Sequence, residues 1–87
     1  MKRRDLLRRL RNGDLSNIPF HDFLEVVEHF GFVVDRTRGS HHIMRHGTIP
    51  GALSLQSRNG EAKPYQVRQF LQLVQRYNLR WDDDDDA

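Results

Sequence analysis

The chain has 87 residues and no cysteine, so it has room for one small domain and excludes disulfide frameworks and thiolate metal sites. No apolar run approaches the roughly 20 residues of a membrane helix, and the basic start has too short an apolar run for a secretory signal, so we expect a cytoplasmic protein without a membrane segment. Without the acidic run at residues 82–86, 14 basic residues stand against 7 acidic ones, and such a basic body attracts polyanions, most commonly nucleic acid.

The first half of the chain predicts two helices. Residues 2–11 indicate a short basic helix with leucines on one side, and "NGD" at residues 12–14 ends it. The clearest helix of the chain falls within residues 18–32, where Pro19 suits a first turn and Gly31 suits the position after the last turn. Its apolar residues recur at helical spacing. They are Phe20, Phe23, Leu24, Val27 and Phe30.

After Gly31 the apolar pattern changes to the two-residue period that is typical of strands. We expect strands at residues 32–37, 40–46 and 52–56, with a turn at Arg38–Gly39 and a loop over residues 47–51. The residues "SRNG" at 57–60 are expected to close the third strand. A last helix is predicted within residues 63–79, where Asn78 suits the position after its end.

These elements predict an α+β fold of order α-β-β-β-α, preceded by a short N-terminal helix. Three strands with short connections should form an antiparallel sheet with both main helices on one face. This is the element order of a double-stranded-RNA-binding-like fold, although a fold alone does not assign a function. We expect three segments: a basic helix and linker at 1–16, the main domain at 17–80, and a disordered acidic tail at 81–87.

The most informative motif is "RTRGSHHIMRH" at residues 36–46. A metal site is one hypothesis, but successive residues of a strand alternate faces, so His41 and His42 should diverge. His42 and His46 share a face but lie about 13 Å apart at a rise of about 3.3 Å per residue. The motif also contains no carboxylate that could complete a ligand set. We therefore predict no metal site.

Acid–base catalysis is a second hypothesis, because a histidine can accept and return a proton near neutral pH. RNA carries its own nucleophile, the ribose 2′-OH, so one well-placed base and some positive charge suffice to cut it. Gly39 allows close approach of a phosphate and Ser40 can bond a phosphate oxygen. The charge would come from Arg36, Arg38 and Arg45. From the residues alone, His41 and His42 are both candidates, and a purely structural role for both stays open.

The segment "FGFVVDRTRGSHHIMRH" resembles the central signature of HicA-type toxins, the small ribonucleases of bacterial HicA–HicB toxin–antitoxin pairs. The resemblance covers roughly residues 17–79 and has four linked features. They are a Gly-Phe step at Gly31-Phe32, Gly-Ser-His at residues 39–41, a basic second strand at residues 42–46, and a closing helix that begins at Lys63-Pro64.

This resemblance implies a type II toxin that is a metal-independent endoribonuclease, cleaves messenger RNA (mRNA) without a cofactor and is neutralised by a HicB-type antitoxin. The family's catalytic histidine corresponds to His41. The remaining expected contacts with RNA or phosphate are Gly39, Ser40, Arg36, Arg38, Arg45 and Lys63. Lys63 stands at the N-terminus of the last helix, where the helix dipole also favours a phosphate.

Three departures from the family pattern leave alternatives open. The basic helix at residues 2–11 and the aspartate run at residues 82–86 have no counterpart, and Ile49-Pro50-Gly51 lacks a histidine that many members carry there. A second catalytic group from the third strand is therefore in doubt. A non-catalytic RNA-binding module of the same fold is an alternative, as is an inactive toxin retained as the partner of an antitoxin.

Overall fold

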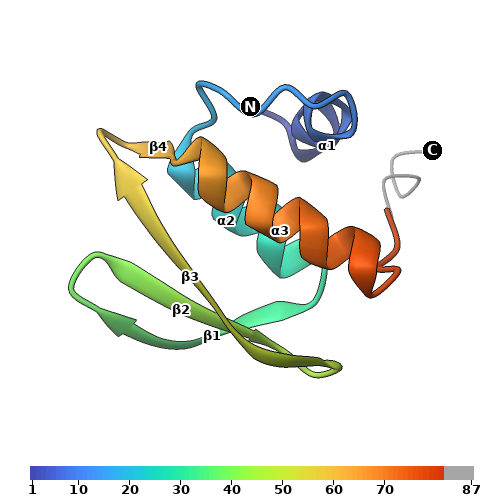
Figure 1. The fold of residues 1–87 in the computed structure, drawn as a ribbon. Helices are drawn as coiled ribbons and strands as arrows, with labels where there is room; N and C mark the ends of the chain where they lie inside the picture. Colours follow the sequence, from blue (N-terminus) through green and yellow to red (C-terminus); the bar gives the residue numbers. More distant parts are fainter. Residues whose placement is uncertain (82–87) are drawn as a thin grey trace.

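The computed structural model describes residues 1–81, and the expected acidic tail lies almost wholly outside them (Figure 1). The elements follow in the order α1 (Arg3–Arg11), α2 (Phe20–His29), β1 (Phe32–Arg38), β2 (His41–His46), β3 (Ile49–Arg58), β4 (Glu61–Ala62) and α3 (Pro64–Arg76). All three helices lie within the ranges that the sequence predicts. The division of the chain at residues 16 and 80 stays a prediction.

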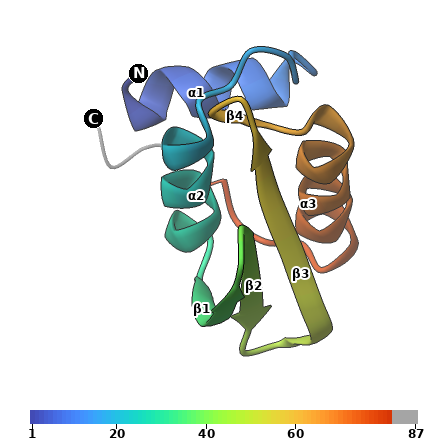
Figure 2. The ribbon, with the colours of Figure 1, turned by 90° about the vertical axis from the view of Figure 1, so that its left-hand side faces the viewer.

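The strands form one antiparallel sheet in the order β1-β2-β3-β4. Helices α2 and α3 lie on the same side of this sheet, and α1 lies across their ends, away from the long strands (Figures 1 and 2). The predicted α+β class is therefore confirmed. The predicted number of strands is wrong, because the sheet within residues 1–81 has four strands instead of three.

The missed strand is β4, which contains only two residues. Asn59 and Gly60, with φ of 53° and 80°, form the turn that pairs Arg58 with Glu61. Positive φ at both central residues is typical of the Asn-Gly hairpin turn. The short strand also joins the start of α2 to the sheet, since the Ala62 N–H donates to the Ile18 carbonyl at 2.8 Å. Two residues are too few to show strand periodicity, which is why the sequence pattern predicts only a turn here.

The third strand is also longer than predicted, because β3 includes residues 49–51 of the expected loop and residues 57 and 58. Its register against β2 shifts between the pairs Met44–Leu53 and His46–Ile49, which leaves three residues of β3 opposite Arg45. Pro50 and Gly51 lie in this bulge, and Gly51 has a φ of 83°. Bulges are one of the few places where a sheet tolerates proline. The Pro-Gly pair therefore marks an irregular strand, where the pattern suggested a loop.

Aromatic rings fix the helices to the sheet. The ring of Phe70 on α3 meets three rings edge-on: Phe23 of α2 at a centroid distance of 5.6 Å, Phe30 just after α2 at 5.3 Å, and Phe32 of β1 at 5.9 Å. Such edge-to-face pairs add to the stabilisation from buried area. Helix α1 joins the same core through three buried leucines, Leu6, Leu7 and Leu10.

Trp81 packs against the helices. Its ring stands edge-on to Phe30 at 5.3 Å, and the guanidinium of Arg11 lies 5.2 Å from its centroid. The chain after α3 is therefore held against the ends of α1 and α2. The helix itself ends as predicted, with Asn78 at a φ of 53° and the Leu79 N–H donating to the Val74 carbonyl at 2.9 Å.

Position 31, in the Gly31-Phe32 step, requires glycine for a steric reason. Gly31 has a φ of 100°, and a Cβ there would lie 3.0 Å from Nε2 of His46. That ring cannot yield easily, because Nε2 bonds the Phe30 carbonyl at 3.1 Å and Nδ1 accepts the Thr48 N–H at 3.1 Å. We therefore expect Gly31→Ala to lower the free energy of unfolding by about 1–3 kcal/mol or more in urea denaturation.

Gly13→Ala is the matched control for this change. Gly13 has a φ of 79°, so alanine meets a comparable backbone strain, but nothing lies within 4 Å of its Cβ position. Gly31→Ala should therefore cost more than Gly13→Ala. Equal losses of stability for the two variants would show that the contact with His46 is unimportant.

The turn after α1 is the basis of a prediction about pH. A hydrogen bond from the Arg9 Nε, at 2.9 Å, is the main reason that the pKa of Asp14 lies below its usual value of about 3.9. A carboxylate with a lowered pKa stabilises the folded chain above its unfolded pKa, and this contribution disappears as the pH falls through the folded pKa. Asp14→Asn should therefore be less stable than wild type at pH 7, with a difference that shrinks below about pH 3.9. Urea denaturation at pH 7 and pH 3 measures it, and a difference that is constant with pH would contradict it.

No helix within residues 1–81 combines the length and apolar character that crossing a membrane requires.

Candidate functional site

The Gly-Ser-His motif forms the turn between β1 and β2. Arg38 pairs with His41 across the hairpin, which leaves Gly39 and Ser40 as the two connecting residues. Gly39 has a φ of 59°, a conformation that glycine adopts without strain, and nothing lies within 4 Å of its Cβ position. The backbone of this turn is therefore exposed and open to a ligand.

The two adjacent histidines lie in different surroundings, as the alternation of a strand predicts. His41 is exposed, and no hydrogen bond to its imidazole occurs among residues 1–81. His42 is half-buried, with its ring 5.3 Å from that of Phe20 and its Nδ1 buried without a hydrogen-bond partner. His41 is the histidine that can meet a ligand, whereas His42 packs against α2.

A chain of hydrogen bonds connects the turn to the start of α3. Lys63 Nζ donates to Oε1 of Gln56 at 2.7 Å, and Nε2 of Gln56 donates to Oγ of Ser40 at 2.9 Å. Lys63 fixes the orientation of the amide, because only its oxygen can accept the lysine proton. Ser40 accepts from Gln56, so its own hydroxyl proton is free to donate. Residues from the β1–β2 turn, β3 and the N-terminus of α3 thus meet at one place.

Gln56 also joins β3 to α3 through its backbone. Its N–H donates to Oε1 of Gln66 at 2.9 Å, and Nε2 of Gln66 donates to the Tyr65 hydroxyl at 3.3 Å. Because the buried Gln66 side chain on α3 bonds the β3 backbone at Gln56, α3 lies beside the edge of β3 that does not pair with β2. The backbone N–H and C=O groups of successive residues point to opposite edges of a strand. Ser54, two residues before Gln56, therefore has its N–H and C=O on this same edge.

The structure separates the three predicted arginines into two groups. Cross-strand partners share a face, so Arg38 lies beside His41, and Arg36 lies two residues further along the same side of β1. Both are exposed and have no ion pair within residues 1–81. Arg45 lies about 13 Å from His41 by strand rise. Its guanidinium pairs with Asp35 at 3.3 Å.

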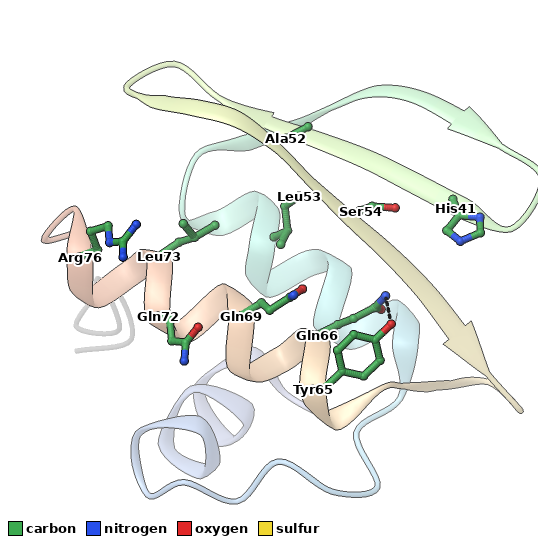
Figure 3. A pocket seen from close by; sticks show the side chains of 10 residues that line it. All are labelled: His41, Ala52, Leu53, Ser54, Tyr65, Gln66, Gln69, Gln72, Leu73 and Arg76. Carbon is green, nitrogen blue, oxygen red and sulfur yellow. Dashed lines mark hydrogen bonds between the residues drawn. The ribbon is translucent and has the colours of Figure 1, made fainter.

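A groove of about 570 Å³ runs between β3 and α3, and we call it the α3 groove (Figure 3). His41 lies at the end near Tyr65, and Arg76 lies at the opposite end. Its lining residues are His41, Ala52, Leu53, Ser54, Tyr65, Gln66, Gln69, Gln72, Leu73 and Arg76. The groove therefore begins at the candidate catalytic histidine.

The sequence did not identify Gln56, Gln66 or Tyr65 as candidate site residues. Gln56 lies in a strand and has no motif around it, so only the fold shows that it bridges Ser40 and Lys63. A signal did exist on α3, where Gln66, Gln69, Gln72 and Gln75 recur at every third residue. Residues three apart lie close on a helix surface, so this repeat predicts a band of amides. Among residues 1–81, no group of three His, Asp or Glu side chains is arranged to hold a metal ion.

Comparison with known proteins gives one positive result. Neither a curated protein nor a solved structure matches the chain. Residues 20–75, more than half of the chain, match the family model described as the HicA toxin of bacterial toxin–antitoxin systems. This range contains the Gly-Ser-His turn, Gln56, Lys63 and almost all of α3. The chain therefore belongs to the family of HicA toxins of bacterial toxin–antitoxin systems.

Proposed function

We propose that this toxin is a metal-independent endoribonuclease that cleaves mRNA with His41 as its catalytic group. The observation that carries the proposal is the exposed His41 imidazole beside the bonded chain of Ser40, Gln56 and Lys63. These residues supply a proton acceptor, a hydroxyl donor and a positive charge around one exposed turn. That set is what transfer of an RNA phosphate to its own 2′-OH requires.

The reaction then follows from the residues. His41 accepts the proton of the 2′-OH as its oxygen forms a bond to phosphorus, and the bond to the 5′ oxygen of the next nucleotide breaks. Protonated His41, or water, returns a proton to that leaving oxygen, giving a 2′,3′-cyclic phosphate and a 5′-OH. Ser40, Lys63 and the Gly39 backbone would stabilise the charge that develops on the phosphate.

Long-range charge also supports RNA as the substrate. Residues 1–81 carry 14 basic against 7 acidic side chains, and twelve of the fourteen are arginine. Arg36 and Arg38, exposed beside His41, can hold phosphates of the strand being cut. We assign Arg45 a lesser part, because Asp35 already neutralises it.

The proposal includes the setting of the reaction. We infer a double-stranded-RNA-binding-like fold, a cytoplasmic location and a HicB-type antitoxin as the protein that blocks the site. The β1–β2 turn is exposed, so it is the surface that such a partner would cover to block His41. A non-catalytic RNA-binding module would use the same charges, and the experiment below separates it from a nuclease.

Incubation of the purified wild-type chain with mixed mRNA in EDTA tests the activity. We expect fragments on a denaturing gel that carry 2′,3′-cyclic phosphate ends, detected by their resistance to 3′-end ligation until the cyclic phosphate is opened and the resulting phosphate is removed. Intact RNA that is nevertheless bound, as judged by a gel shift, would identify a binding module. Fragments that appear only with added Mg²⁺ would contradict the metal-free mechanism.

Gln56→Ala tests the bonded chain. The variant keeps the backbone N–H that bonds Gln66, but it releases Ser40 and Lys63 together. We expect RNA cleavage to slow by about tenfold or more, since positioning errors of this kind reduce rates strongly. Gln75→Ala, an exposed glutamine of α3 outside the α3 groove, is the control. Equal cleavage rates for both variants would show that Gln56 has no role in the site.

A further inference from the structure

The α3 groove extends beyond the groups that the proposed reaction uses. We propose that it binds the single-stranded RNA next to the cut bond, with a base stacked on Tyr65 and base edges bonded by Gln69 and Gln72. This inference rests on the proposed function, because it takes RNA as the substrate at His41. It adds the form of RNA that is recognised and the residues that recognise it.

Two amides of the groove are free to bind a ligand. Gln69 and Gln72 are exposed, and within residues 1–81 neither side chain has a hydrogen-bond partner. An amide offers a donor and an acceptor together, which matches the paired groups on the edges of bases. Gln66 differs, because its amide is already bonded to Gln56 and Tyr65. Gln66 therefore supports the groove, whereas Gln69 and Gln72 are available to read a base.

Tyr65 provides an aromatic surface at the end near His41. Tyr65 is 51% exposed, although its hydroxyl accepts a hydrogen bond from Nε2 of Gln66 at 3.3 Å. A ring that is anchored at one end and exposed on its face suits base stacking, the common means by which proteins hold unpaired bases. Figure 3 shows this ring at the same end of the groove as His41, next to Gln66. A base stacked there would place the adjacent phosphate near the catalytic histidine.

The far end and the length of the groove also fit RNA. Arg76 lines that end and has no ion pair within residues 1–81, so it can hold a phosphate. Tyr65 and Arg76 are eleven residues apart, about 16 Å along a helix. Stacked nucleotides rise about 3.4 Å each, so the groove is about as long as five of them.

Two observations and one general property of RNA recognition favour a single RNA strand as the occupant of the groove. No carboxylate occurs among the described residues of the lining, so nothing there repels a phosphate. Proteins that read RNA sequence act mostly on unpaired bases, and readers of duplex RNA contact mainly backbone. The start of α3 has one lysine, Lys63, and then Tyr65 and Gln66, which suits bases better than a duplex backbone. The alternative occupant is a peptide strand paired with the free edge of β3, and the test below distinguishes it from RNA.

Binding of a fluorescein-labelled RNA 8-mer with 2′-O-methyl groups tests the proposal, because this probe lacks the nucleophile and cannot be cut. Fluorescence anisotropy would compare the full-length wild type with Tyr65→Ala and with the double variant Gln69→Ala/Gln72→Ala. We expect each to weaken binding roughly five- to hundredfold. Tyr65→Phe keeps the stacking ring and should bind within about twofold of wild type. Gln75→Ala and Arg68→Ala, on the same helix but outside the lining, should also match wild type, and thermal melts would verify folding.

The outcomes separate this inference from the proposed function. Weaker binding by the groove variants supports the groove even if the wild type cuts no RNA. The wild type could cut RNA while Tyr65→Ala and Gln69→Ala/Gln72→Ala bind the probe as tightly as wild type and cut at the same positions. That result would overturn the binding of RNA in the groove and leave the proposed nuclease function intact. Equal or tighter binding of the matched duplex, or loss of binding to a co-purified antitoxin without loss of RNA binding, would also overturn it.

Discussion

His41→Ala is expected to reduce RNA cleavage by about 10²–10⁴-fold, the usual contribution of a positioned acid–base group. The variant should fold normally, because His41 is exposed and its side chain supports no other residue among those described. It should also keep most of its RNA affinity, since Arg36, Arg38, Ser40 and Lys63 remain. The initial rate on a labelled mRNA fragment in EDTA measures the loss, and anisotropy with the uncleavable 8-mer measures binding.

His42→Ala is the matched control for that prediction. His42 packs against Phe20, and its buried Nδ1 has no partner, so its removal changes packing and not the chemistry. We expect a lower melting temperature and a cleavage rate within a fewfold of wild type at a temperature where both variants are folded. The opposite pattern, with His42→Ala inactive and His41→Ala active, would show that His42 and not His41 is the catalytic group.

Phe70→Ala is expected to have the largest effect on stability, about 3–5 kcal/mol. Phe70 is fully buried, and its ring joins α3 to both α2 and β1. A chain of this size has roughly 4–13 kcal/mol of total stability, so the loss removes much of it. At about 4–8 °C per kcal/mol, the melting temperature should fall by more than about 12 °C. Differential scanning calorimetry gives this value directly.

Phe70→Leu is the control, because leucine fills most of the same space and should cost clearly less than alanine. Phe70→Ala should also disturb the site, since α3 carries Lys63 and the α3 groove. A melting temperature within about 4 °C of wild type for Phe70→Ala would contradict the described core.

The sequence predicts those elements of the fold that are long enough to show a periodic pattern of apolar residues. The apolar stripes of α2 and α3 are long enough to locate both helices, and Gly31 and Asn78 occur where those helices end. The period-two runs locate β1 and β2. A turn is also predicted at Arg38–Gly39, because glycine and a tight hairpin connection go together. The observed connection is Gly39–Ser40, one residue later, because Arg38 still pairs with His41.

Other features depend on tertiary contacts that leave no local pattern. β4 is two residues long and exists because it bonds residues before α2, and β3 continues through a Pro-Gly bulge that looks like a loop. Gln56 is part of the candidate site only because folding brings Ser40 and Lys63 to its amide. Arg45 belongs to the motif in sequence, but Asp35 engages it at a distance from His41.

Cleavage of two RNA oligonucleotides that differ by a single 2′-oxygen tests the central claim most directly. One carries ribose throughout, and the other carries 2′-deoxyribose only at the nucleotide before the mapped cut. Both would be incubated with the wild-type chain in EDTA. The proposed mechanism predicts that the all-ribose strand is cut to a 2′,3′-cyclic phosphate and that the substituted strand is bound equally but stays intact. Cleavage of both strands at that bond would show that the 2′-OH is not the nucleophile and would contradict the mechanism.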